Sequence, residues 1–148
     1  MDERVVRLKT PTECATFEKN VIERGRPDLA LDARKRALEL QAQAFGATTK
    51  AEKECIEAVY AYERALTDKN GKTTRASRTW PMIKRLGIIA AVDQIVTRTK
   101  ETVGYATLLE MGLEDYAFEA VVLRYPYLFS KDAVEHSQSR VNEWKQNK

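Results

Sequence analysis

The residues of this sequence whose types suit a chemical task are concentrated in one basic segment, residues 69–100. It contains eight lysine and arginine residues and a single acidic residue, Asp93, so its net charge is +7. The rest of the chain carries −4, so the 148-residue protein, with an overall charge of +3, is electrically polarised along its sequence. A solvated face usually mixes both signs, so the imbalance favours a polyanionic ligand. The alternative is that the cations simply face water or pair with acidic residues of other helices.

The first part of this segment, residues 69–85, predicts a surface that binds the phosphates of DNA or RNA. Lysine and arginine bind nucleic acid by displacing the counterions that condense on its phosphates. Hydroxyl groups and the free backbone N–H groups of a helix start add donors for phosphate oxygens. The residues predicted to contact nucleic acid are Lys69, Lys72, Arg75, Ser77, Arg78, Thr79, Lys84, Arg85 and Arg98.

Two features limit how this surface could read a nucleic acid. Trp80 could stack on an unpaired base, but it shares a helical face with Ile83, and we favour a place in the core because large aromatic residues dominate core burial. The helix expected after Gly87 is mostly apolar and offers only Asp93 and Gln94 to base edges. A recognition helix presents several polar side chains, so we expect contact with the backbone more than base reading.

A second interpretation is a protein-interaction or regulatory module, such as a subunit or inhibitor that docks on an acidic or nucleic-acid-binding partner. The C-terminal part is acidic, and its aromatic cluster, Tyr125, Tyr127 and Phe129, supplies candidate partner contacts because tyrosine is enriched in interfaces. The alternative, which we favour, is that these aromatic residues close the core beneath the turn at Pro126. Opposite charge in the two parts also allows head-to-tail self-association.

Catalysis and metal binding have weak support in the sequence. His136 is the only histidine and lies on the polar side of the last predicted helix. Glu110, Glu114, Asp115 and Glu119 could hold a metal, but at helical spacing we expect them to point outward as a charged face. Because glycine-rich phosphate loops and nucleophile elbows are absent, we expect a binding protein with no cofactor and no metal, more than an enzyme.

The compartment is predicted to be the cytosol. Cys14 and Cys55 fall at apolar positions of predicted helices and are expected to be reduced core residues. The N-terminus mixes charges and lacks the apolar core of a signal peptide. No apolar run approaches the roughly 20 residues that span a bilayer, so we expect no membrane association.

The elements that must position these residues are predicted to be helices, because apolar residues recur every three to four positions and strand signals are nearly missing. Capping patterns at Thr10–Glu13 and Thr48–Glu52 predict helix starts. In the basic segment, a loop follows Asn70-Gly71, Ser77 or Thr79 caps the next helix, and Pro81 lies in its first turn. Glycines at 25, 46, 87 and 112 are expected to end helices.

This pattern predicts an all-α fold, a single-domain orthogonal bundle of about seven helices over residues 1–148. Residues 69–100 would form a basic loop and helical hairpin, and residues 105–144 an acidic, aromatic C-terminal part. Residues 1–9 are expected to be a charged lead-in with a short edge strand through Val5, and residues 113–124 one continuous helix. The last helix would bury Val134, Val141 and Trp144.

Overall fold

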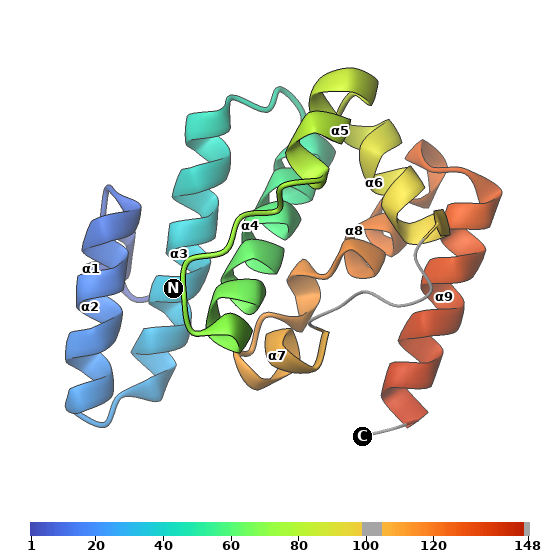
Figure 1. The fold of residues 1–148 in the computed structure, drawn as a ribbon. Helices are drawn as coiled ribbons and strands as arrows, with labels where there is room; N and C mark the ends of the chain where they lie inside the picture. Colours follow the sequence, from blue (N-terminus) through green and yellow to red (C-terminus); the bar gives the residue numbers. More distant parts are fainter. Residues whose placement is uncertain (99–104, 147–148) are drawn as a thin grey trace. The chain divides into compact units, whose positions relative to one another are not determined.

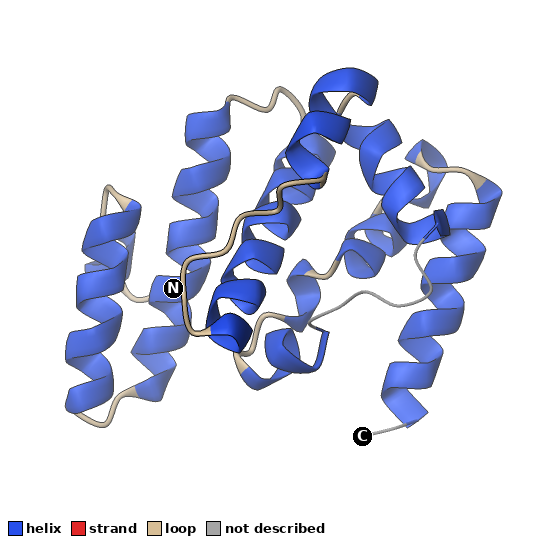
Figure 2. Ribbon diagram, viewed as in Figure 1, coloured by secondary structure: helices blue, strands red, loops and turns tan. Residues whose placement is uncertain are grey.

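The computed structural model describes residues 1–98 and 105–146, and nearly all of them are helical (Figure 1). The described residues form nine α-helices and two short 3-10 helices, and no strand occurs among them (Figure 2). The predicted all-α class is therefore confirmed. Within this part of the chain, every helix is too short or too polar to cross a membrane. Contacts divide the chain into two compact units, residues 1–47 (unit 1) and residues 48–148 (unit 2).

Unit 1 consists of α1 (Glu3–Val6), α2 (Pro11–Glu23) and α3 (Pro27–Phe45). The expected edge strand at the N-terminus is wrong, because these residues form a helical turn. The Asp2 carboxylate accepts a hydrogen bond from the backbone N–H of Arg4 at 2.8 Å and so caps α1. The turn buries Val5 completely, which an isolated charged lead-in would leave exposed.

Local capping also sets the start of α2. The Thr10 hydroxyl accepts from the backbone N–H of Glu13 at 3.1 Å, as predicted, and the Glu13 carboxylate reaches back to the N–H of Lys9 at 2.8 Å. α2 and α3 pack together as an antiparallel pair around Val21, Leu29 and Ala30.

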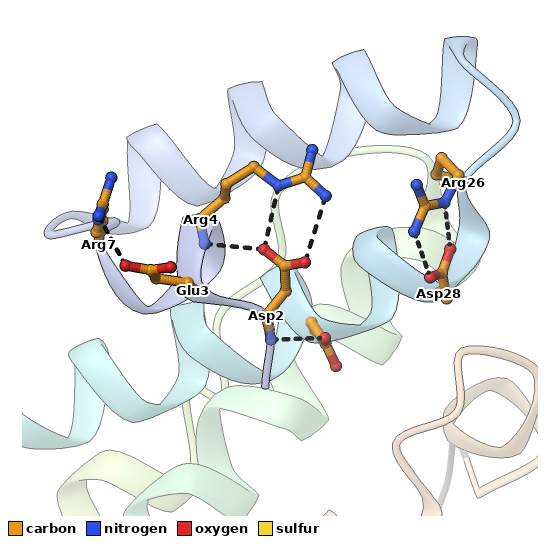
Figure 3. A network of polar contacts seen from close by, with 7 residues as sticks. Asp2, Glu3, Arg4, Arg7, Arg26 and Asp28 are labelled. Carbon is orange, nitrogen blue, oxygen red and sulfur yellow. Dashed lines mark hydrogen bonds and ion pairs between the residues drawn. The ribbon is translucent and has the colours of Figure 1, made fainter.

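The surface of unit 1 carries ion pairs between residues close in sequence (Figure 3). Arg4 donates to the Asp2 carboxylate from Nε at 3.1 Å and from Nη2 at 3.3 Å. Arg26 donates to the Asp28 carboxylate from the same two nitrogens, at 3.1 and 2.9 Å. These hydrogen bonds lower the pKa of both aspartates. Arg4 and Arg26 are therefore already paired with neighbouring carboxylates.

Unit 2 is built on one long helix, α4 (Lys50–Asn70), which contacts α6, α7 and α8. Thr49 caps α4, as predicted, by accepting from the backbone N–H of Glu52 at 3.1 Å. The further elements are α5 (Thr79–Leu86), α6 (Ile88–Arg98), α7 (Tyr105–Glu110), η1 (Glu114–Tyr116), α8 (Phe118–Arg124), η2 (Pro126–Leu128) and α9 (Lys131–Gln146).

The continuous helix expected over residues 113–124 is wrong. Ala117 is extended, with φ −63° and ψ 147°, so the chain divides into η1 and α8. One regular helix would place Leu113 and Ala117 on the same face and Phe118 on another, whereas the break allows all three to be buried. The break also turns Glu119 into the core, where its exposed fraction is 0%.

The buried face of α9 also differs from the expected one. Ala133, Ser137 and Arg140 are buried, whereas Val134, Val141 and Trp144 are only half-buried. Arg140 is drawn inward because its Nη1 lies 2.9 Å from the carboxylate of Glu119 on α8.

Both cysteines are buried free thiols, as predicted, one in each unit. Burial raises the pKa of both, and that of Cys55 to about 12. Neither thiol is therefore suited to act as a thiolate nucleophile near neutral pH.

Candidate nucleic-acid interface

The basic segment begins where α4 ends and then runs back alongside that helix (Figure 1). Gly71 adopts φ 71°, which reverses the chain. The backbone N–H of Thr74 then donates to the Thr67 hydroxyl at 3.0 Å, and that of Ala76 donates to the Glu63 carboxylate at 2.8 Å. Two loop residues thus pass about one turn of α4, roughly 6 Å, so this part of the loop is extended.

Glu63 fastens this loop to α4. Its side chain points inward, with 8% of the residue exposed, and one oxygen, Oε2, accepts three hydrogen bonds. The donors are Arg75 Nε at 2.9 Å, the Ala76 backbone N–H at 2.8 Å and Trp80 Nε1 at 2.7 Å. One buried carboxylate therefore joins α4, the loop and α5, and its charge is balanced by Arg75.

Trp80 packs within unit 2. Its ring lies 5.1 Å from that of Tyr60, at an interplanar angle of 55°, and its indole N–H is bonded to Glu63. These contacts fit the core interpretation of Trp80. They leave the residue poorly placed to stack on an unpaired base, because its indole N–H is bonded to Glu63 and its ring packs against that of Tyr60.

The start of α5 differs from the predicted one. Neither Ser77 nor Thr79 caps this helix, because the cap position is occupied by Arg78 and Thr79 is buried in the first turn. The backbone N–H groups of Thr79 and Trp80 both donate to the carbonyl of Ala76, at 3.0 and 3.3 Å. Pro81 lies in the first turn, as predicted, and has no N–H. The helix start therefore offers few free backbone donors to an anion.

The side chains predicted to contact phosphates are exposed, with one exception. Thr79 is buried, with 9% of the residue exposed. In the described part of the chain, Arg75 is the member of this set with a carboxylate partner, Glu63. No ion pair occurs there for the five exposed cations Lys69, Lys72, Arg78, Lys84 and Arg85.

The structure brings some of these cations together and separates another. Lys69 and Lys72 line one hollow of about 650 Å³ beside Thr73, where Asp68 and Glu110 also lie. Arg98 lines a different hollow of about 790 Å³, at the junction of α5 and α6. Lys100 lies outside the described residues. The prediction grouped Arg98 with the loop because the two are close in sequence, but they line different hollows.

The aromatic cluster of the C-terminal part does not present one exposed patch. The hydroxyl of Tyr125 donates to the Glu54 carboxylate, and this hydrogen bond raises the pKa of Tyr125 to about 12. Phe129 is buried, with 9% of the residue exposed, whereas Tyr127 is 77% exposed. Tyr125 and Phe129 thus help to close unit 2 beneath the turn at Pro126, and Tyr127 remains accessible.

The acidic residues considered for a metal have different surroundings. Glu119 was expected to point outward, and this is wrong, because it is fully buried against Arg140. Among the residues that the structure describes, no group of three or more histidine, cysteine or acidic side chains could hold a metal ion. His136 is exposed on α9, with Nδ1 2.9 Å from the carbonyl oxygen of Asp132.

Glu63 is the functional candidate that sequence reasoning missed. Its position in the sequence could have identified it, because Glu63 lies on the buried stripe of α4 with Ile56 and Val59. A carboxylate at an apolar position requires buried donors, and here the following loop supplies them.

Comparison of the chain with protein-family models, with curated proteins and with solved structures gives no match.

Proposed function

We propose that unit 2 is a non-enzymatic nucleic-acid-binding module that contacts phosphates through exposed side chains of the basic segment. The observation that supports this proposal is the set of five exposed cations, Lys69, Lys72, Arg78, Lys84 and Arg85, with no carboxylate partner among the described residues. Cations that are not already paired release phosphate counterions at no cost in broken ion pairs.

The extended loop suits contact with a nucleic-acid backbone. Lys72 and Arg75 lie three residues apart in this loop, and an extended chain rises about 3.3 Å per residue, so these two cations start about 10 Å apart. Arg78 lies beyond the extended part, in the turn that leads into α5. A DNA strand advances about 3.4 Å per nucleotide along the helix axis, so the interval between Lys72 and Arg75 corresponds to about three nucleotides. Such contacts carry no sequence information, in keeping with the apolar character of α6.

The decisive experiment is a titration of DNA and RNA duplexes and single strands across salt concentrations. The triple variant Arg78→Gln, Lys84→Gln, Arg85→Gln should weaken binding and reduce the slope of log K against log salt by about 2.7 on duplex DNA, if each side chain contacts one phosphate. Circular dichroism should show unchanged helix content, because all three side chains are exposed.

Unit 1 supplies the matched control. Arg4→Gln, Arg7→Gln and Arg26→Gln remove the same total charge, but from side chains paired with Asp2, Glu3 and Asp28. This triple variant should leave the salt slope close to that of the wild type. Salt-independent affinity, or an equal loss in the two triple variants, would contradict the proposal.

The second candidate, a protein-interaction module, is favoured by the hollow beside α6. Its lining includes Leu86, Ile88 and Leu128, and the two leucines are 40% and 41% exposed. Exposed apolar residues gathered in a hollow are typical of interaction sites. A stoichiometric protein partner that co-purifies without nucleic acid, and that is lost on Leu128→Gln, would favour this candidate. Concentration-dependent sedimentation that is abolished by the same change would instead indicate self-association.

A further inference from the structure

Arg75 differs from the other cations of the basic segment because a buried carboxylate holds it. Its Nε lies 2.9 Å from Glu63 Oε2, yet 65% of the Arg75 side chain is exposed. Among the described residues, the guanidinium makes no other hydrogen bond. Its two terminal nitrogens therefore keep their donors available at the surface, while the inner edge of the group is fixed.

The surroundings of Arg75 restrict its orientation further. The guanidinium carbon lies 5.9 Å from the centre of the Trp80 ring, close enough for a cation–π contact. Trp80 in turn packs on Tyr60 and is bonded to the same Glu63 oxygen. The hydrogen bond to Glu63 also raises the pKa of Arg75, which keeps the group charged. Arg75 is thus anchored on one side and open on the other.

We propose that Glu63 is a positioning residue for nucleic-acid binding, which holds Arg75 so that its two terminal NH2 groups form a bidentate contact with a backbone phosphate. This inference rests on the proposed function of the basic segment. A planar guanidinium matches two phosphate oxygens, and a side chain that is already oriented loses less conformational freedom on binding.

The proposal gives a prediction opposite in sign to simple electrostatics. Glu63 is an acidic residue beside a basic surface, so its neutralisation raises the local charge by one unit and, from Coulomb attraction alone, should tighten the binding of a polyanion. If Glu63 positions Arg75, the same change should weaken binding, because the guanidinium and the loop lose their anchor.

The test measures the affinity of the full chain for a fluorescein-labelled 20-base-pair DNA duplex. We expect Glu63→Gln to raise Kd roughly tenfold, the scale set by hydrogen bonds to charged groups. Arg75→Gln should weaken binding and lower the salt slope by about 0.9. In the Arg75→Gln background, Glu63→Gln should cause little further loss, because the two residues act as one unit.

The matched control is Asp68→Asn, which removes one negative charge from the same helix, beside Lys69 and Lys72, without contact to Arg75. This change should tighten binding slightly. A second variant keeps the proposal testable if Glu63→Gln fails to fold in urea titrations: Arg75→Lys retains the charge but not the planar group, and should weaken binding about as much as Arg75→Gln.

Two outcomes would overturn the inference: tighter binding by Glu63→Gln, or wild-type affinity in Arg75→Lys. An equal loss from Glu63→Gln in the presence and absence of the Arg75 guanidinium would also overturn it, because Glu63 would then act only on the loop as a whole. Failure of the wild-type protein to bind DNA at any salt concentration would instead remove the proposed function itself.

Discussion

Unit 1 and the basic segment of unit 2 are both rich in cations, but they differ in how many of these cations form ion pairs. Unit 1 holds nine basic and eight acidic residues, and five of its six arginines pair with carboxylates. The pairs are Arg4–Asp2, Arg7–Glu3, Arg26–Asp28, Arg34–Glu18 and Arg36–Glu39. In the described part of the basic segment, Arg75 is the cation with such a partner.

Pairing with carboxylates, more than the number of cations, therefore separates the two regions. In unit 1, Arg4, Arg7 and Arg26 are exposed, and each pairs with a carboxylate within four residues along the chain. Carboxylates near the basic segment have other partners. Asp68, next to Lys69, lies 3.6 Å from Arg64, and Asp93 is bonded to the backbone and hydroxyl of Ser130 at 2.6 and 3.0 Å. The cations of the basic segment therefore stay available to an outside anion.

Ion pairs also differ in burial, and the largest effect on stability is expected when a buried pair is broken. Arg140 and Glu119 form a pair whose side chains are 9% and 0% exposed. Arg140→Leu should cost about 3–5 kcal/mol in the free energy of unfolding, because it leaves a buried carboxylate without its cation. Urea denaturation measures the loss. The matched control is Lys145→Leu, an exposed position of the same helix, and a loss below about 1 kcal/mol in Arg140→Leu would show that the pair is solvated.

The hydrogen bond from the Tyr125 hydroxyl to the Glu54 carboxylate should make a smaller, pH-dependent contribution to the free energy of unfolding. This hydrogen bond raises the pKa of Tyr125 to about 12 from 10 in the unfolded chain. Between these values the folded state keeps a proton that the unfolded state has lost, so stability falls as the pH rises. The contribution is fully present below about pH 10 and is lost on the way to about pH 12.

Comparison of the wild type with Tyr125→Phe isolates this contribution. The difference in their free energies of unfolding should be constant up to about pH 10 and should shrink above it. Tyr127→Phe is the control, since its hydroxyl belongs to an exposed residue. A difference that does not change with pH would indicate that the Tyr125 hydroxyl bonds to Glu54 only weakly.

The smallest effect is expected on the surface of unit 1. The side chains of Arg7 and Glu3 are 75% and 80% exposed, although their charged atoms are 2.7 Å apart. Arg7→Gln should change the free energy of unfolding by less than about 0.5 kcal/mol, because solvent screens an exposed pair and its side chains lose rotamer freedom. A loss above about 1 kcal/mol would contradict the expectation that exposed ion pairs contribute much less to stability than buried ones.

Much of the local structure could be predicted from sequence. The caps at Thr10 and Thr49, the helix end at Gly71 and the all-α class all follow from residues within one or two turns of each other. The first residues were predicted wrongly because the cap at Asp2 was overlooked, and an isolated helical turn has a weak apolar pattern. The break at Ala117 was missed because it depends on how many side chains the surrounding helices can bury.

The candidate site was only partly predictable. The concentration of positive charge is a property of composition, and the exposure of most of its side chains follows from their polarity. The roles of Glu63, Arg75 and Trp80 were not predictable, because they depend on how the loop lies along α4.

Helix boundaries and the accumulation of positive charge follow from local sequence, because capping, glycine conformations and composition act over a few neighbouring residues. Which carboxylate meets which cation depends instead on how the helices and loops pack. Arg75 pairs with Glu63, 12 residues away, and Arg140 with Glu119, 21 residues away. Both carboxylates lie in the core, where the cost of desolvation requires a partner, and packing alone determines which partner is within reach.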